Sequence, residues 1–120
     1  MAEYKLLFYE TVDERCPSKE FLRDLPIKDA GKIARWLGLL ERQGPQLLRP
    51  YADIVQGKIR ELRVQLGGMQ YRLLYFFWGR HVVITHGFVK KTSAIPDEEV
   101  ARAIRAMHDF YRRLNQGGER

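Results

Sequence analysis

The stretch KIRELRVQLGGMQYRLLYFFWGRHVVITHGFVKK, residues 58–91, decides the fold of this chain. Two short breaks, Gly67-Gly68 and Gly79-Arg80, divide it into three runs that are rich in Val, Ile, Leu, Tyr and Phe. Such runs favour β-strands, and breaks of this length favour hairpins. The stretch therefore predicts three successive antiparallel strands, over residues 58–66, 71–78 and 81–91.

Shorter elements are expected on either side of this meander. Residues 3–10 (EYKLLFYE) predict a first strand, and Cys16-Pro17-Ser18 predicts the start of a brief helix over residues 19–24. A second helix is expected over residues 27–42, because apolar residues recur there at three- and four-residue steps. These apolar residues are Ile33, Ala34, Trp36, Leu37 and Leu40.

Residues 46–57 are expected to be a connector, because Arg49-Pro50 forces an extended backbone and Gly57 follows. A last helix of about 19 residues is expected from Ile95-Pro96-Asp97 onwards, with acidic residues in its first turn. Its apolar stripe consists of Val100, Ile104, Met107, Tyr111 and Leu114.

The expected element order is β-α-α-β-β-β-α, in one domain that spans residues 1–120. We predict an α+β fold with a small antiparallel sheet of about four strands, packed by the two N-terminal helices, plus the C-terminal helix. The other face of the sheet is expected to be partly open, and the last four or five residues to be frayed.

The positive charge of the chain is concentrated on the predicted meander. The formal net charge is +6, whereas residues 1–55 and residues 92–120 each carry equal numbers of basic and acidic residues. Residues 56–91 carry a single acid, Glu61, against Lys58, Arg60, Arg63, Arg72, Arg80, Lys90 and Lys91. A sheet with surplus cations is typical of a surface that binds a polyanion.

Several other classes of protein do not fit the composition. The single cysteine, Cys16, cannot form an internal disulfide, and the chain has neither a signal-peptide pattern nor an apolar run of membrane-spanning length, so we expect a cytoplasmic protein. His81 and His86 lie five residues apart and are expected on opposite faces of one strand, which does not favour a metal site.

Strand alternation indicates which side chains share a face. Glu61 and Arg63 are expected to face away from the core, while Arg72 lies on a strand that is apolar on both faces and needs a partner there. A bend at Gly87 is expected to bring Lys90 and Lys91 towards one cleft.

Such a cleft would suit cleavage of RNA through its own 2′-hydroxyl, which needs a base and cations near the phosphate. The candidate catalytic residues are Glu61, Arg63, Arg72, Lys90 and Lys91. The candidate RNA-binding residues are Lys58, Arg60, His86, Lys90 and Lys91.

The same residues also fit structural roles. Arg72 and Glu61 can form a structural ion pair, the two lysines can be a solvated strand edge, and His86 can be a satisfied histidine of the sheet. The chemistry of the residues by itself therefore indicates a small basic α+β domain that binds nucleic acid.

Four segments together resemble the HigB/RelE-type toxins of bacterial toxin–antitoxin modules, and their phage-derived branch most of all. The segments are GKIRELR (57–63), YRLLY (71–75), HGFVKKT (86–92) and PDEEVARA (96–103). The resemblance also takes in Phe21-Leu22 and Leu39-Leu40 with Gly44-Pro45, so that it covers nearly the whole chain.

The resemblance implies a ribosome-dependent endoribonuclease that cuts messenger RNA without a metal or other cofactor and is silenced by a helix-turn-helix (HigA-like) antitoxin. It assigns Arg63 and Arg72 to the charge on the phosphate, Lys90 and Lys91 to RNA binding and proton transfer, and Glu61 to the base or to the orientation of Arg72. Some relatives carry a catalytic tyrosine near the C-terminus, whereas Tyr111 here is spaced as a core residue. A ParE-like inhibitor of DNA gyrase on the same fold and a non-catalytic RNA-binding module are the alternatives.

Overall fold

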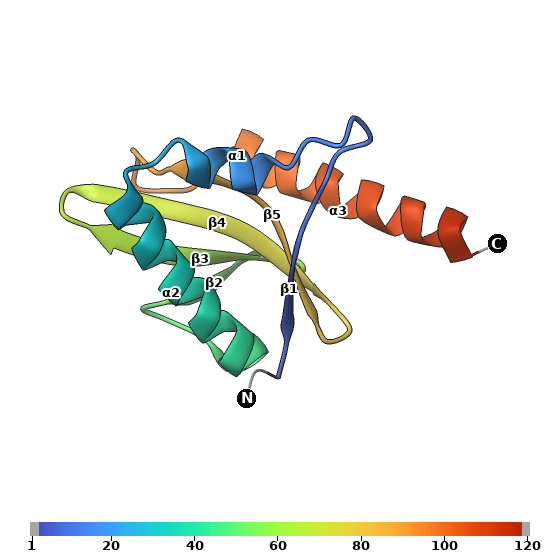
Figure 1. The fold of residues 1–120 in the computed structure, drawn as a ribbon, viewed down its shortest axis with the longest axis horizontal. Coiled ribbons are helices and arrows are strands. Elements are labelled where there is room, and N and C mark those ends of the chain that lie inside the picture. Colours follow the sequence, from blue (N-terminus) through green and yellow to red (C-terminus); the bar gives the residue numbers. More distant parts are fainter. Residues whose placement is uncertain (1–2, 119–120) are drawn as a thin grey trace.

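The computed structural model describes residues 3–118 and confirms an α+β fold (Figure 1). Its elements are β1 (Lys5–Phe8), α1 (Pro17–Arg23), α2 (Ile27–Gln43), the 3-10 turn η1 (Gly44–Gln46), β2 (Ala52–Gln56), β3 (Ile59–Leu66), β4 (Met69–Trp78), β5 (His81–Val89) and α3 (Asp97–Gly118). The end of α3 includes residues 116–118, which were expected to be frayed, while residues 119 and 120 lie outside the described part.

The sheet is mixed and has five strands in the order β1-β5-β4-β3-β2. The antiparallel meander β3-β4-β5 is confirmed, and β1 pairs with β5 in parallel. The sequence predicts about four strands, and the fifth arises because β2 forms within the segment that the sequence indicates as a connector. This short edge strand has only Ala52 fully buried, so it lacks the apolar run by which a strand is recognised.

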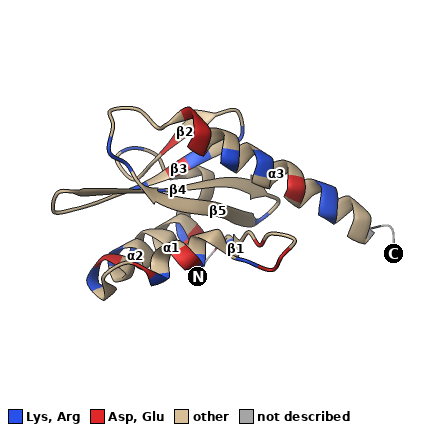
Figure 2. Ribbon diagram, turned by 90° about the horizontal axis from the view of Figure 1, so that it is seen from above, with Lys and Arg blue, Asp and Glu red and all other residues tan. Residues whose placement is uncertain are grey.

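Helices cover both faces of the sheet (Figure 2). On one face Ile33, Leu37 and Leu40 of α2 pack with buried residues of the strands. Ala34 was predicted to belong to this apolar stripe, but it is exposed. On the other face Ala103 and Ala106 of α3 pack against the sheet. This second face was expected to be partly open, and α3 covers the part of it across which it lies.

A bulge in β5 decides which side chains face α3. Leu74 pairs with His86 and Tyr75 pairs with Ile84, so Thr85 is an extra residue on β5. The bulge reverses the alternation of the strand. His81 stacks on Trp78, and His86 bonds to Glu99 of α3, so both histidines lie on the face that α3 covers. The prediction that they point to opposite faces is wrong.

Gly87 has a different use from the expected bend. A Cβ atom at this position would lie 2.4 Å from a ring carbon of Phe21, so the glycine allows α1 to pack closely on β5. No helix within residues 3–118 combines the length and the apolar character that crossing a membrane requires.

Candidate functional site

The site is built around a buried carboxylate on β3. Glu61 is 6% exposed and Arg72, on the adjacent strand β4, is 3% exposed. Nε of Arg72 lies 2.9 Å from Oε1 of Glu61, as an ion pair without the alignment of a hydrogen bond. A buried guanidinium without a counterion would cost several kcal/mol, so Glu61 is the partner that Arg72 needs.

The remaining nitrogen atoms of Arg72 are also engaged. Nη1 donates to the carbonyl of Tyr71 at 3.1 Å, and Nη2 donates to Oε1 of Gln70, also at 3.1 Å. Burial lowers the pKa of Arg72, and the charge of Glu61 opposes this effect. Arg72 is thus held in one orientation beneath the surface, and this conformation gives a substrate no access to it.

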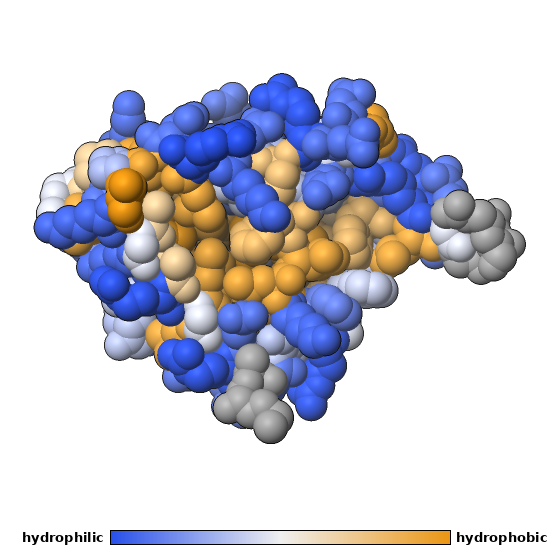
Figure 3. All heavy atoms as spheres, viewed as in Figure 1, coloured by the Kyte–Doolittle hydropathy of each residue, from blue (hydrophilic) through white to orange (hydrophobic). Residues whose placement is uncertain are grey.

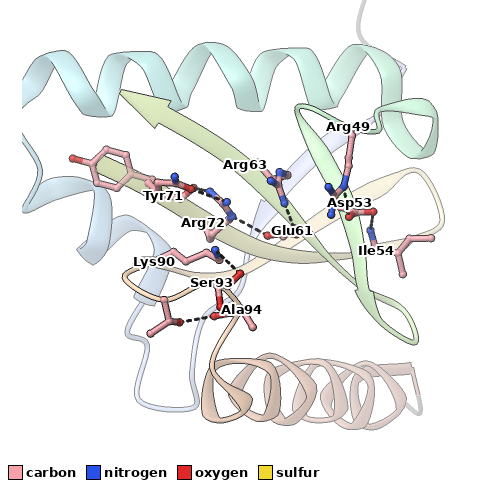
Figure 4. Close-up of polar contacts among 12 residues, drawn as sticks. Arg49, Asp53, Ile54, Glu61, Arg63, Tyr71, Arg72, Lys90, Ser93 and Ala94 are labelled. Carbon is pink, nitrogen blue, oxygen red and sulfur yellow. Dashed lines mark hydrogen bonds and ion pairs between the residues drawn. The ribbon is translucent and has the colours of Figure 1, made fainter. Parts of the chain in front are cut away.

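Glu61 also binds a second arginine (Figure 4). Nη1 of Arg63 donates to Oε2 of Glu61 at 3.1 Å, and the Arg63 side chain is 27% exposed. Arg63 and Arg72 lie directly opposite each other in the β3–β4 register, where like charges repel. Glu61 compensates both cations, and Arg63 is the one that reaches solvent.

Arg63 lines an open polar hollow of about 500 Å³. The polar residues that line it come from β2 and the loop before it, from β3, and from the segment that leads into α3 with the first residue of that helix. They are Arg49, Asp53, Gln56, Glu61, Arg63, Lys90, Ser93 and Asp97. Nζ of Lys90 donates to the carbonyl of Ser93 at 3.1 Å, which fixes the lysine at the wall. The structure therefore brings Arg63, Lys90 and Glu61 together, with Arg72 immediately below them.

Arg49, Asp53 and Asp97 are members of this hollow that the sequence did not indicate. Asp53 lies directly opposite Glu61 in the β2–β3 register and binds Arg49 with an Oδ2–Nε distance of 2.7 Å, which lowers the pKa of Asp53. The missed strand β2 explains the omission, because only strand pairing places Asp53 beside Glu61. A short polar edge strand after Pro50 is the sequence signal that would have placed Asp53 in the candidate site.

The other predicted site residues lie elsewhere. Lys91 is exposed and lines a neighbouring hollow. Lys58 lies in the turn before β3, with its Nζ 5.9 Å from the centre of the Tyr111 ring. Arg60 faces the α2 side of the sheet, where it donates to the carbonyl of Pro45. The expected convergence of the sheet cations therefore holds for Arg63, Arg72 and Lys90, and not for Lys58 or Arg60.

His86 is buried and has a polar neighbour at each ring nitrogen. It is 1% exposed, its Nε2 donates to Oε1 of Glu99 at 2.9 Å, and its Nδ1 lies 3.0 Å from the hydroxyl of Thr85. Burial lowers the pKa of His86 to about 3, and Arg102 adds to this effect. A neutral, enclosed imidazole cannot contact RNA, so this geometry leaves His86 with the structural role.

The buried His86 predicts a loss of stability in acid. In the unfolded chain His86 binds a proton at its ordinary pKa near 6.5, whereas in the folded chain its pKa is about 3. As the pH is lowered from 6.5 towards 3, the free energy of unfolding should therefore fall by up to about 1.4 kcal/mol per pH unit. Urea unfolding from pH 7 to pH 4 measures this slope. His86→Gln should reduce it, and an unchanged slope in that variant would contradict the assignment.

A larger hollow, of about 640 Å³, lies between β1 and the C-terminal part of α3. It is mostly apolar and therefore fits a polyanion less well. Figure 3 shows apolar surface that runs from the centre of the view towards that end of α3. Within residues 3–118, no three His, Cys, Asp or Glu side chains are grouped as a metal site would require.

Comparison with known proteins identifies one family. The family model described as "Phage derived protein Gp49-like (DUF891)" matches residues 20–108, which include the Glu61 cluster and the polar hollow. No curated protein matches the chain.

Proposed function

Because the chain belongs to the Gp49-like family of phage-derived proteins, a family related to RelE/HigB-type toxins, we propose that it is a toxin that cleaves messenger RNA on the ribosome. The family suggests an antitoxin partner. The observation that carries the proposal is the pair of arginines bridged by Glu61 at the floor of an open polar hollow.

In the proposed reaction the 2′-oxygen of a ribose attacks the adjacent phosphorus and the bond to the 5′-oxygen breaks. The 2′-hydroxyl loses its proton to a base, and the leaving 5′-oxygen gains one. The products are a 2′,3′-cyclic phosphate and a 5′-hydroxyl. Negative charge grows on the phosphate oxygens, and fixed donors in the site stabilise it.

Each residue has a role that follows from its position. Arg63 is the partly exposed cation beside Glu61 and contacts the phosphate. Lys90, at the wall of the same hollow, binds RNA and takes part in proton transfer. Glu61 and Arg72 are positioning residues, because Glu61 is engaged by both arginines and Arg72 is buried.

The partners follow from the same proposal. The ribosome would present the messenger RNA, and a helix-turn-helix antitoxin of the HigA-like kind would silence the toxin. Action on ribosomes places the protein in the cytoplasm. Side chains supply the charge compensation at the phosphate, so the proposed reaction uses no metal or other cofactor.

Incubation of the purified protein with ribosomes that carry a defined messenger RNA tests the proposal. We expect new RNA ends with a 2′,3′-cyclic phosphate and a 5′-hydroxyl, mapped by sequencing of the fragments. Intact messenger RNA together with inhibited DNA gyrase would support the ParE-like alternative. Salt-dependent binding without cleavage would support a non-catalytic RNA-binding module.

A further inference from the structure

A second hollow adjoins the first. Its volume is about 510 Å³, and on one side it is lined by Gly68, Met69 and Gln70 of the β3–β4 hairpin. On the other side it is lined by Val89 at the end of β5 and by Lys90, Lys91, Thr92 and Ser93, which follow. Lys90 and Ser93 line both hollows. A chain molecule that occupies the first hollow can therefore continue past Lys90 into the second.

The walls of the second hollow are held by hydrogen bonds. The backbone N–H of Lys90 donates to the carbonyl of Gln70 at 2.8 Å, which ties the loop after β5 to the hairpin. The hydroxyl of Thr92 donates to the carbonyl of Ala94 at 2.6 Å, and Lys90 donates to Ser93. A ligand would thus meet a formed site, which lowers the entropic cost of binding.

Gln70 connects this hollow to the buried ion pair. A guanidinium has only donors, so the atom of Gln70 that meets Nη2 of Arg72 must be the amide oxygen. The NH₂ group of the same amide is therefore directed away from Arg72. It has no hydrogen bond within the described residues and can donate to a ligand.

Two neighbouring side chains complete the match to a nucleotide. Lys91 is exposed and has no ion pair or hydrogen bond among residues 3–118. Met69, also at the wall, is 41% exposed and offers an apolar contact. A nucleotide has the complementary parts: a charged phosphate, an apolar base face and a base edge with acceptors.

We propose that the second hollow binds a nucleotide of the RNA chain next to the phosphate that is cleaved. Lys91 contacts a flanking phosphate, Met69 lies against the base, and the Gln70 amide donates to an acceptor on the base edge. This inference rests on the proposed action on RNA. It makes Gln70 a determinant of base preference, oriented by Arg72.

The phosphate contact is tested by binding of a fluorescent 2′-O-methyl oligoribonucleotide of about eight nucleotides, which cannot be cleaved. Anisotropy titrations give Kd at several salt concentrations. Lys91→Gln should reduce the slope of log K against log salt by about 0.7, the value for one phosphate contact on a single strand. The control, Lys28→Gln, removes an equal charge from an exposed site on α2 and should leave the slope close to that of the unchanged protein.

The base contact is tested with Gln70→Glu. The carboxylate still accepts from Arg72, so folding should be preserved, but it has no NH₂ group. Its negative charge weakens binding to all RNAs alike, so the readout is the ratio of Kd values among oligonucleotides that differ in one base. We expect the preference of the unchanged protein, about 10-fold, to disappear.

Three outcomes overturn the inference: no RNA binding, a Lys91→Gln slope equal to that of Lys28→Gln, or an unchanged base ranking in Gln70→Glu. These outcomes are separate from failure of the proposed function. If the protein binds RNA in the expected way but cuts no messenger RNA on ribosomes, only the proposed nuclease activity is refuted. If it cuts messenger RNA but both variants bind RNA as the wild type does, only the proposed role of the second hollow is refuted.

Discussion

Arg63→Ala is expected to lower the rate of messenger RNA cleavage by about 10²–10³-fold, the usual cost of losing one well-placed donor to a charged transition state. Of the two arginines that pair with Glu61, Arg63 lines the hollow and Arg72 is buried, so Arg72 cannot replace it. Single-turnover cleavage on programmed ribosomes measures the rate. Arrest of growth on expression gives a second readout.

Arg80→Ala is the matched control. Arg80 is exposed in the turn between β4 and β5, where its guanidinium lies over the ring of Tyr4, and it does not line the polar hollow. Loss of this cation should leave the rate of messenger RNA cleavage close to that of the wild-type protein. A folded Arg63→Ala protein that cuts as fast as the Arg80→Ala control would refute the role of Arg63.

Glu61→Gln is expected to lower the free energy of unfolding by about 3–5 kcal/mol, because it leaves Arg72 buried without a counterion. A change of this size is a large fraction of the free energy of unfolding of a typical domain, which is about 5–15 kcal/mol. Urea unfolding followed by circular dichroism measures it. A Glu61→Gln protein as stable as the unchanged chain would show that Arg72 does not depend on this ion pair.

A double variant separates the structural role of the pair from its role in the site. Glu61→Leu with Arg72→Met replaces the buried ion pair by apolar side chains, a change that often restores stability. Arg63 then lacks the carboxylate that holds it, so cleavage should stay slow although the protein is folded. Recovery of both stability and cleavage would leave Glu61 and Arg72 with a structural role alone.

Much of the fold could be predicted from local patterns. The glycine breaks within residues 58–91 set the two hairpins, and the helical stripe that includes Ile33, Leu37 and Leu40 set α2. The edge strand β2 could not be predicted in the same way, because its polar residues and the preceding Pro50 resemble a loop. The omission of β2 also hid Asp53 from the candidate site.

The sequence by itself determined the antiparallel meander, the helices and the need of Arg72 for an acidic partner, because strand alternation, helical periodicity and the cost of a buried charge are local properties. Only the tertiary structure decided which cations reach solvent. The packing of α3 on the sheet joins segments that are distant in the chain. The bulge at Thr85 and the pairing of β2 with β3 depend on the register between two strands, which the residue pattern of one strand does not fix. These contacts bury Arg72 and His86, leave Arg63 and Lys90 at one hollow, and turn Lys58 and Arg60 away from it.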